Sequence, residues 1–434
     1  MRAMKDSGIE WIGQIPQGWH VDRLKYCTDL DSEKLSEKTD PEYAFNYIDI
    51  SSVTEYGGIG STQEMTFDKS PSRARMIVHD GDTIISTVRT YLKAIAYIDG
   101  LEDHICSTGF CVVTPNKKLH PKFGYYLLQS DYFVQKIVSE SVGVSYPAIS
   151  SSEIGNMSIA IPDPEEQTRI ARHLDNKCAE IDALITAKEK TNALLKERRQ
   201  SIIYEAVTKG LNPDAPMKDS GFEWIGEIPE HWSVGKTIYG LEMPITDGPH
   251  ETPQLYSDGV PFVSAEAVSC GNGKIDFDHI RGYISEEYYD ECCKKYIPQI
   301  NDIYMIKSGA TTGKVAIVDT ERKFTIWSPL AVFRCAESKC HYKYLFYFLQ
   351  SNAYQKQLEA KWSFGTQQNI GMRTLERLIV CFPGINEQKS IAEYLDTCCN
   401  ETDHMISANE ATIQKLKEYR QSIIYEAVTG KIEV

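Results

Sequence analysis

Two long stretches of the chain carry apolar side chains at alternating intervals of four and three residues, the spacing of a helix face that packs on another helix. The first stretch follows Asp163-Pro164-Glu165-Glu166, which is typical of a capped helix start, and Gly210 supplies its stop. The pattern predicts a helix of about 45 residues, on the order of 65 Å long. Its seam positions are Leu174, Cys178, Ile181, Ile185, Lys188, Asn192, Leu195, Arg199, Ile202 and Ala206.

A second stretch with the same pattern begins at about Gly384. Both helices are too long for a globular domain to support along their whole length, so we expect them to pack on each other as an antiparallel coiled coil, with an insert at each end. The alternative is a solvated helix that dimerises with another molecule. The seam positions of the second helix are Leu395, Cys399, Thr402, Ile406, Asn409, Ile413, Leu416, Arg420, Ile423 and Ala427.

The chain is an internal repeat. The string MKDSGIEWIGQIP at 4–16 returns as MKDSGFEWIGEIP at 217–229, and RQSIIYEAVT at 199–208 returns without change at 420–429. Between these markers the two halves keep their layout but not their residues. The repeat therefore predicts one frame used twice and two inserts with different tasks.

Each insert shows short alternating or β-branched runs bounded by Gly, Asp or Pro, which predict mixed β-structure with a few helices. We expect helices at 121–140 and 341–361. The expected strands are 43–53, 76–85, 94–98, 106–113, 261–267, 300–306, 314–318 and 329–333.

The predicted fold class is α+β, with two mixed α/β domains joined by two long helices that form an antiparallel coiled coil in a pseudo-two-fold internal repeat. The first domain covers 1–162 and the central long helix 163–210. The second domain covers 211–383 and the C-terminal long helix 384–434.

Composition limits the classes of function. The chain has a formal net charge of −15, with 42% hydrophobic residues. This charge excludes unspecific nucleic-acid binding over the whole surface, so any DNA contact must be local. No apolar run long enough for a membrane span and no leader-like segment at the start is present, so we expect a cytoplasmic protein. The twelve cysteines form no C-x-x-C pair, which favours reduced thiols over a zinc site.

Two pairs of loops combine small, polar and basic residues as a base-reading surface would. They are 86–93 with 143–147 in the first insert, and 307–314 with 365–369 in the second. Arg or Lys can pair with guanine, Gln or Asn with adenine, and Thr can meet a thymine methyl group. Each loop alone is also typical of an ordinary turn, and the matched positions in both halves favour a shared role. The candidate DNA contacts are Ser86, Thr87, Arg89, Thr90, Tyr91, Lys93, Ser145, Tyr146, Lys307, Ser308, Thr311, Thr312, Lys314, Gln367, Gln368 and Asn369.

No catalytic motif was found. The string from Gly309 to Lys314 has three residues between its glycines and Val315 after its lysine, so it does not match a phosphate loop. No dinucleotide fingerprint, H-E-x-x-H zinc motif or recognised serine or cysteine nucleophile is present. We therefore expect no catalytic residue and no metal ligand.

The repeated strings carry a family resemblance. MKDSGIEWIGQIPQGW at the start, IPDPEEQTRIA before the first long helix and RQSIIYEAVT at each helix end resemble the specificity subunits of type I restriction-modification systems. The resemblance covers both halves. It implies that each target-recognition domain reads one half of a bipartite site on double-stranded DNA, without catalysis by the chain itself.

The resemblance also implies partners. Two methyltransferase subunits would dock on the helices and methylate adenine with S-adenosylmethionine, and restriction subunits would use ATP and Mg²⁺. These cofactors would belong to the partners alone. Two other hypotheses remain: a coiled-coil scaffold that binds protein without DNA readout, favoured by the acidic charge, and a complete enzyme with an unrecognised site.

Overall fold

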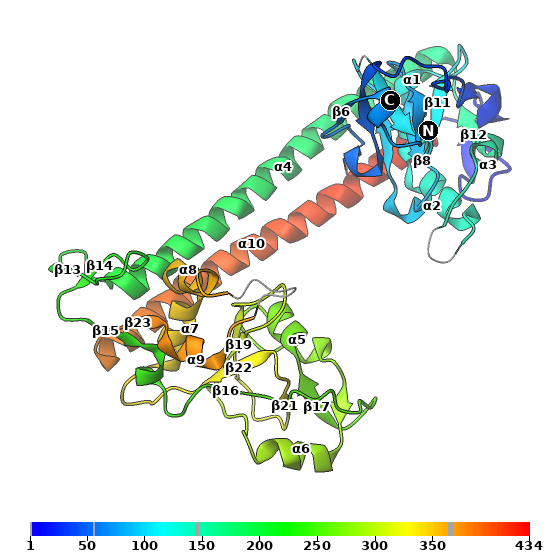
Figure 1. The fold of residues 1–434 in the computed structure, drawn as a ribbon. Helices are drawn as coiled ribbons and strands as arrows, with labels where there is room; N and C mark the ends of the chain where they lie inside the picture. Colours follow the sequence, from blue (N-terminus) through cyan, green and yellow to red (C-terminus); the bar gives the residue numbers. More distant parts are fainter. Residues whose placement is uncertain (1, 55–56, 102, 144–146, 363–368) are drawn as a thin grey trace. The chain divides into compact units, whose positions relative to one another are not determined.

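A computed structural model describes residues 2–54, 57–101, 103–143, 147–362 and 369–434 of the chain. The chain divides into two compact units (Figure 1). Unit 1 comprises Met1–Glu189 with Asn409–Val434, and unit 2 comprises Lys190–Ala408. Each unit therefore combines one insert with a part of each long helix.

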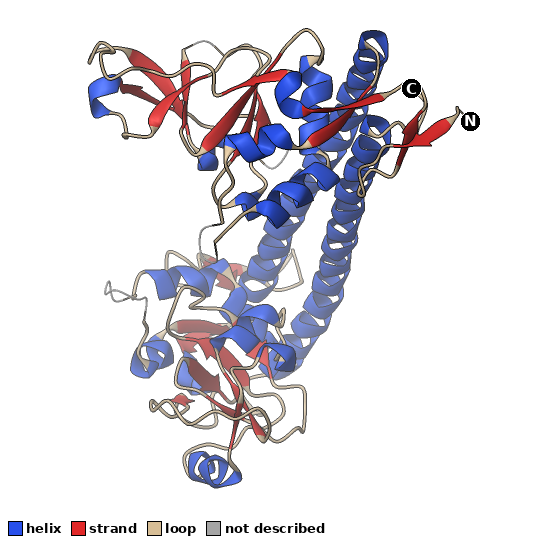
Figure 2. Ribbon diagram, turned by 90° about the vertical axis from the view of Figure 1, so that its right-hand side faces the viewer, coloured by secondary structure: helices blue, strands red, loops and turns tan. Residues whose placement is uncertain are grey.

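The two long helices are α4 (Pro164–Lys209) and α10 (Ile385–Val428). In each unit the parts of α4 and α10 lie side by side in both views (Figures 1 and 2). No helix among the described residues is long and apolar enough to cross a membrane. The shorter helices are α1 (Pro121–Gln129), α2 (Asp131–Glu140), α3 (Ser151–Asn156), α5 (Ala265–Cys270), α6 (Glu286–Cys293), α7 (Tyr342–Gln350), α8 (Asn352–Glu359) and α9 (Met372–Arg377).

The insert of unit 1 is built on two four-stranded sheets, ordered β6-β5-β10-β7 and β4-β11-β8-β9, with β5 and β10 as a parallel pair. Two small antiparallel pairs, β1 with β2 and β3 with β12, connect this insert to the helices. The strands are β1 (Met4–Asp6), β2 (Gln14–Pro16), β3 (His20–Arg23), β4 (Thr28–Leu30), β5 (Ala44–Ile48), β6 (Gln63–Thr66), β7 (Ala74–Ile77), β8 (Thr83–Ser86), β9 (Ile95–Tyr97), β10 (His104–Ser107), β11 (Phe110–Pro115) and β12 (Ser158–Ile161).

The insert of unit 2 repeats one four-stranded sheet and the parallel strand pair, while its second sheet, β18-β17-β21, has three strands. The sheet β16-β22-β19-β20 matches β4-β11-β8-β9, and the parallel pair of β17 and β21 matches that of β5 and β10. The strands are β13 (Met217–Asp219), β14 (Glu227–Pro229), β15 (Ser233–Lys236), β16 (Thr246–Asp247), β17 (Val260–Val263), β18 (Tyr283–Ile284), β19 (Ile303–Ile306), β20 (Val315–Ile317), β21 (Thr325–Ile326), β22 (Leu330–Phe333) and β23 (Ile379–Phe382).

In unit 1 the two long helices pair antiparallel. Arg420 Nε donates to Asp182 Oδ1 at 2.9 Å, and Lys188 Nζ donates to Asn409 Oδ1 at 2.9 Å, so later residues of α4 meet earlier residues of α10. The second contact explains the polar interruption of the seam: its side chains bond to each other across the helix pair. The predicted antiparallel packing is confirmed in this unit.

Unit 2 repeats the pairing, but here the arginine belongs to α4 and the aspartate to α10. Arg199 Nε lies 3.2 Å from Asp403 Oδ1, so the arginine of the repeated string meets an aspartate on the opposite helix in both units. Seam residues are buried or half-buried throughout. Among the leucines and isoleucines of the seam, the buried ones are Leu174, Ile181, Ile185, Leu395, Ile406 and Ile423, and the half-buried ones are Leu195, Ile202, Ile413 and Leu416.

A buried glutamine near the start of each long helix holds the insert to it. Gln167 accepts from the backbone N of His120 at 2.7 Å and donates to Lys118 O and Pro162 O. Gln388 makes the same contacts with His341, Lys339 and Pro383 in unit 2. Because each side-chain amide satisfies backbone groups of the insert, the first turn of the helix is fixed to it.

Several predicted elements are wrong in their extent. The expected helices at 121–140 and 341–361 are each two helices, because Ser130 and Ser351 take extended backbone and donate their hydroxyls to Leu127 O and Phe348 O. The strand at 76–85 is divided by a turn into β7 and β8, and the strand at 106–113 into β10 and β11. The strand expected at 261–267 ends at 263, where α5 follows.

Packing at the helix seam predicts a first outcome. Ile185 is fully buried and its neighbour Leu184 is 53% exposed. Ile185→Ala should lower the free energy of unfolding by about 2–5 kcal/mol, because it leaves a cavity between tightly packed helices. Leu184→Ala is the matched control and should change it by less than about 0.5 kcal/mol. Denaturant titration followed by circular dichroism measures the free energy of unfolding of both variants. Equal losses in the two variants would contradict the packing of Ile185 between the helices.

Two histidines predict a dependence of stability on pH. Burial lowers the pKa of His120 and of His341, and Lys389 and Lys343 lower that of His341 further. The unfolded chain therefore binds more protons near the unperturbed value of about 6.5, and stability should fall as the pH drops through that value. The double variant His120→Asn, His341→Asn should show a shallower loss of melting temperature between about pH 7 and 5.5. If the melting temperature of the double variant falls as steeply with pH as that of the wild type, these histidines are not the cause of the pH dependence.

Candidate nucleic-acid interface

A groove of about 1590 Å³ lies in unit 1 between the insert and α10. The insert contributes the ends of its sheets and the start of α2, and α10 contributes residues between 414 and 425. The groove is therefore bounded on one side by the divergent insert and on the other by the repeated frame.

Backbone hydrogen bonds bring the loops at this groove together. Thr87 N donates to Gly109 O at 2.8 Å and Thr108 N donates to Arg73 O at 2.8 Å. Arg89 N donates to Pro147 O at 2.9 Å. Loop 86–93 thus contacts Pro147, the last residue of the second candidate loop.

The groove is locally basic in an acidic protein. Its basic lining residues outnumber its acidic ones, which are Asp49, Asp131 and Glu418. Lys93 Nζ lies 3.5 Å from Asp131 Oδ1, and the buried Arg420 bonds to both Asp182 and Gln129. Local positive charge of this kind is what attraction to a phosphate backbone requires. The basic lining residues are Arg73, Arg89, Lys93, Lys417 and Arg420.

The loop at the groove holds strained backbone. Arg89 (φ 52°) and Lys93 (φ 53°) flank the 3₁₀ turn Thr90–Leu92, and both take the left-handed conformation. That conformation costs an L-residue about 1–2 kcal/mol. Strain of this kind clusters at functional sites.

The predicted contacts of the first insert fall into three groups. Arg89, Tyr91 and Lys93 are exposed, and Arg89 and Lys93 line the groove. Ser145 and Tyr146 lie outside the described residues.

The remaining three require a correction. Ser86, Thr87 and Thr90 are buried, and their hydroxyls are bonded inside the chain: to Val88 O at 2.6 Å, to Gly109 O at 2.9 Å and to the Ser141 hydroxyl at 2.8 Å. These side chains stabilise the loop from within, so they do not present a hydroxyl to a base.

In unit 2 the corresponding loops also meet. Ile370 N donates to Lys307 O at 2.9 Å, and Ser308 pairs with Asn369 in an isolated bridge. Asn369 is exposed, whereas Gln367 and Gln368 lie outside the described residues.

The other candidates in this loop differ in exposure. Thr311 and Thr312 are half-buried, and the Thr312 hydroxyl donates to Gly309 O at 2.7 Å. Lys314 is exposed and Lys307 is buried. The correction extends to Lys307, because its side chain is largely buried and its ammonium lies 3.3 Å from the buried carboxylate of Asp247.

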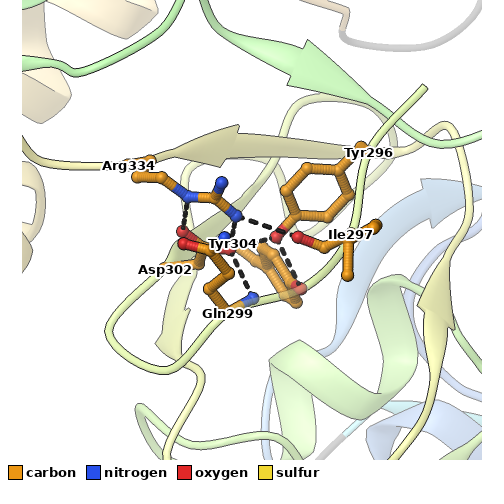
Figure 3. Close-up of polar contacts among 6 residues, drawn as sticks. All are labelled: Tyr296, Ile297, Gln299, Asp302, Tyr304 and Arg334. Atoms are coloured by element: carbon orange, nitrogen blue, oxygen red, sulfur yellow. Dashed lines mark hydrogen bonds and ion pairs between the residues drawn. The ribbon is translucent and has the colours of Figure 1, made fainter. Parts of the chain in front are cut away.

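A buried polar network fixes the segment before β19 (Figure 3). Arg334 donates to both carboxylate oxygens of Asp302 at 2.7 Å, and the Tyr296 hydroxyl donates to the same carboxylate. Gln299 N donates to Asp302 at 2.8 Å. Burial raises the pKa of Tyr296 and of Tyr304, so both hydroxyls stay protonated as donors.

Several residues of these sites were not found from the sequence. Arg73 and Lys417 line the groove, and Asp247 and Lys295 form a charged cluster in unit 2. Only Arg420 carried a signal, because it belongs to the repeated string. Within the described part of the chain, no three His, Cys, Asp or Glu side chains converge as metal ligands would.

Comparison with known proteins gives one consistent match. The family model described as the type I restriction modification DNA specificity domain matches residues 17–196 and 254–415. The putative type I restriction enzyme MjaX specificity subunit of Methanocaldococcus jannaschii is 25% identical over 441 residues, covering 98% of this chain and 96% of its own. The EcoKI specificity subunit of Escherichia coli K12 is 22% identical, covering 97% and 90%.

Solved structures agree with these relatives. A chain from work on complex assembly and conformational transition of the type I R-M system superposes with a TM-score of 0.73 at 25% identity, covering 96% of this chain and 99% of its own. The HsdS subunit from Thermoanaerobacter tengcongensis gives a TM-score of 0.51 at 25% identity, covering 96% and 98%.

The strained loop predicts a difference between two substitutions of one residue. Lys93→Gly and Lys93→Ala remove the same charge, but only glycine relieves the left-handed backbone. The glycine variant should be more stable than the alanine variant by about 0.5–1 kcal/mol, since the greater entropy of unfolded glycine offsets part of the relief. Thermal melting compares them, and a more stable alanine variant would refute the strain at Lys93.

Proposed function

The chain belongs to the family of type I restriction-modification DNA specificity subunits, and from that premise we propose that unit 1 binds its half of a bipartite DNA site in the groove between insert and α10. The observation that carries the proposal is the basic lining of this groove in a chain of net charge −15. Unit 2 reads the other half-site through the matching end of its sheet β16-β22-β19-β20.

The groove offers two kinds of DNA contact. Lys417 belongs to the frame, so its contact is suited to a phosphate, which carries no sequence information, whereas the buried Arg420 is already bonded to Asp182 and Gln129. Arg73 and Arg89 belong to the divergent insert, and an arginine can bond bidentately to guanine. The insert therefore supplies specificity and the helix supplies position.

Catalysis belongs to the partners in this proposal. Two methyltransferase subunits dock on the exposed faces of the long helices, bind S-adenosylmethionine and methylate adenine. Restriction subunits bind ATP and Mg²⁺. The chain itself is a non-catalytic reader, and it works in the cytoplasm, which we take to be the compartment of its DNA. Purified chain alone should transfer no methyl group, and measurable transfer would favour a complete enzyme.

The competing function is a coiled-coil scaffold that binds proteins without DNA readout. Its support is the net negative charge of the chain, which repels the phosphates of DNA and so weakens DNA binding by the isolated chain. A scaffold would add no sequence preference to a methyltransferase complex.

One experiment separates these functions. The chain is reconstituted with its methyltransferase subunits, and the methylated sites are mapped by single-molecule sequencing for wild type and for Arg73→Ala, Arg89→Ala. The double variant should lose discrimination in one half-site, at about 1–3 kcal/mol for each lost base contact, and keep the other. Arg23→Ala, an exposed arginine of β3, is the control. Unchanged methylation by the double variant would contradict the groove.

A further inference from the structure

Unit 2 contains a buried carboxylate with two lysine ammonium groups and a histidine ring around it. The Asp247 side chain is fully buried at the end of β16, with Lys295 Nζ 2.5 Å from Oδ1, and with Lys307 Nζ at 3.3 Å and His250 Nε2 at 3.2 Å from Oδ2. One carboxylate neutralises one ammonium. The cluster therefore keeps an excess of positive charge at this edge of the sheet.

The two lysines differ in exposure. The Lys307 side chain is 10% exposed and the Lys295 side chain is 50% exposed. Lys307 is thus the buried counterion of Asp247, and Lys295 is the charge that remains open to solvent. Lys295 donates to Asp247 with one of the three donors of its ammonium, and its half-exposed side chain leaves the ammonium open to a further acceptor.

Lys295 is held from two sides. Its ammonium is fixed by Asp247, and its chain neighbour Tyr296 is fixed by the Asp302 network, in which Arg334 also donates to Ile297 O at 2.9 Å (Figure 3). A free lysine loses about 2 kcal/mol of rotamer entropy when a ligand fixes it. Here most of that ordering is completed when the protein folds, which favours binding.

One member of the cluster, Lys307, holds the sheet position that Thr87 holds next to the groove of unit 1. Lys307 N donates to Pro329 O at 2.8 Å, the same bond between strand ends that Thr87 N makes to Gly109 O in unit 1. Gly109 lines the groove of unit 1. At this shared position unit 1 has the buried Thr87, and unit 2 has Lys307, which pairs with Asp247 in the charged cluster.

We propose that Lys295 binds an acceptor of DNA in the second half-site, and that Asp247 is its positioning residue. The inference rests on the proposed function and adds a residue-level contact to it. The acceptor is either the O6 and N7 edge of guanine or a phosphate oxygen, since a lysine ammonium can donate to both.

The test uses the complex reconstituted with methyltransferase subunits and a duplex that carries the full site. Lys295→Met should weaken binding several-fold. If the acceptor is guanine, one position of the second half-site relaxes in the methylation map. If it is a phosphate, all positions weaken equally and the slope of log K against log salt falls by about 0.9. The control is Lys274→Met, which removes an exposed lysine of unit 2 paired with Asp319 at 2.9 Å.

The role of Asp247 needs a variant that leaves no buried charge alone. Asp247→Asn, Lys307→Met removes the carboxylate and its buried counterion together and leaves Lys295 without its anchor. The double variant should reproduce part of the loss of Lys295→Met while the first half-site and the melting temperature stay unchanged. Unchanged affinity, salt slope and methylation map in both variants would overturn the inference.

Failure of this inference is distinguishable from failure of the proposed function. If wild-type complex methylates without a bipartite preference, the proposed function fails. If the Arg73, Arg89 variant loses one half-site while Lys295→Met behaves like Lys274→Met, the groove stands and the Lys295 contact alone is rejected.

Discussion

Antiparallel packing of α4 on α10 is the constraint on which the rest of the structure depends. In each unit an arginine from one copy of RQSIIYEAVT pairs with an aspartate of the opposite helix: Arg420 with Asp182, and Arg199 with Asp403. The tyrosine of the same string donates to a backbone carbonyl in the hairpin of its unit. Tyr425 donates to Trp11 O between β1 and β2, and Tyr204 donates to Ile225 O between β13 and β14. One short string thus packs the helices and fixes the hairpin, which explains why both copies are identical while the inserts differ.

The frame allows the inserts to differ in sequence because it is bonded to backbone atoms of the inserts. The buried glutamines Gln167 and Gln388 bond to backbone atoms of the insert, so the side chains there are free to vary. Both inserts keep the order of one four-stranded sheet and the parallel pair of the second sheet, and they differ in the remaining strands of that second sheet. In unit 1 the basic residues of the groove lie where the loops converge, which on an acidic protein favours the proposed local contact with DNA.

The long helices and the repeat could be predicted from the sequence because periodicity and identity are local signals. The breaks at Ser130 and Ser351 could not, since an amphipathic pattern runs through both and only a side-chain bond to the preceding turn marks them. Among the candidate contacts, loop position was informative but exposure was not: Arg89 and Thr87 are two residues apart, yet one lines the groove and the other is buried. Asp247 and Lys295 are brought together by tertiary structure alone, so no spacing in the sequence announces them.

The most direct measurement of the central claim, that one frame presents two interchangeable readers, is a methylation map of a chain with a duplicated insert. Residues 231–382 are replaced by a second copy of residues 18–161, and the chain is reconstituted with its methyltransferase subunits. The account predicts methylation at sites whose two halves carry the same recognised sequence, that of the first insert. Methylation that retains the original second half-site would contradict it.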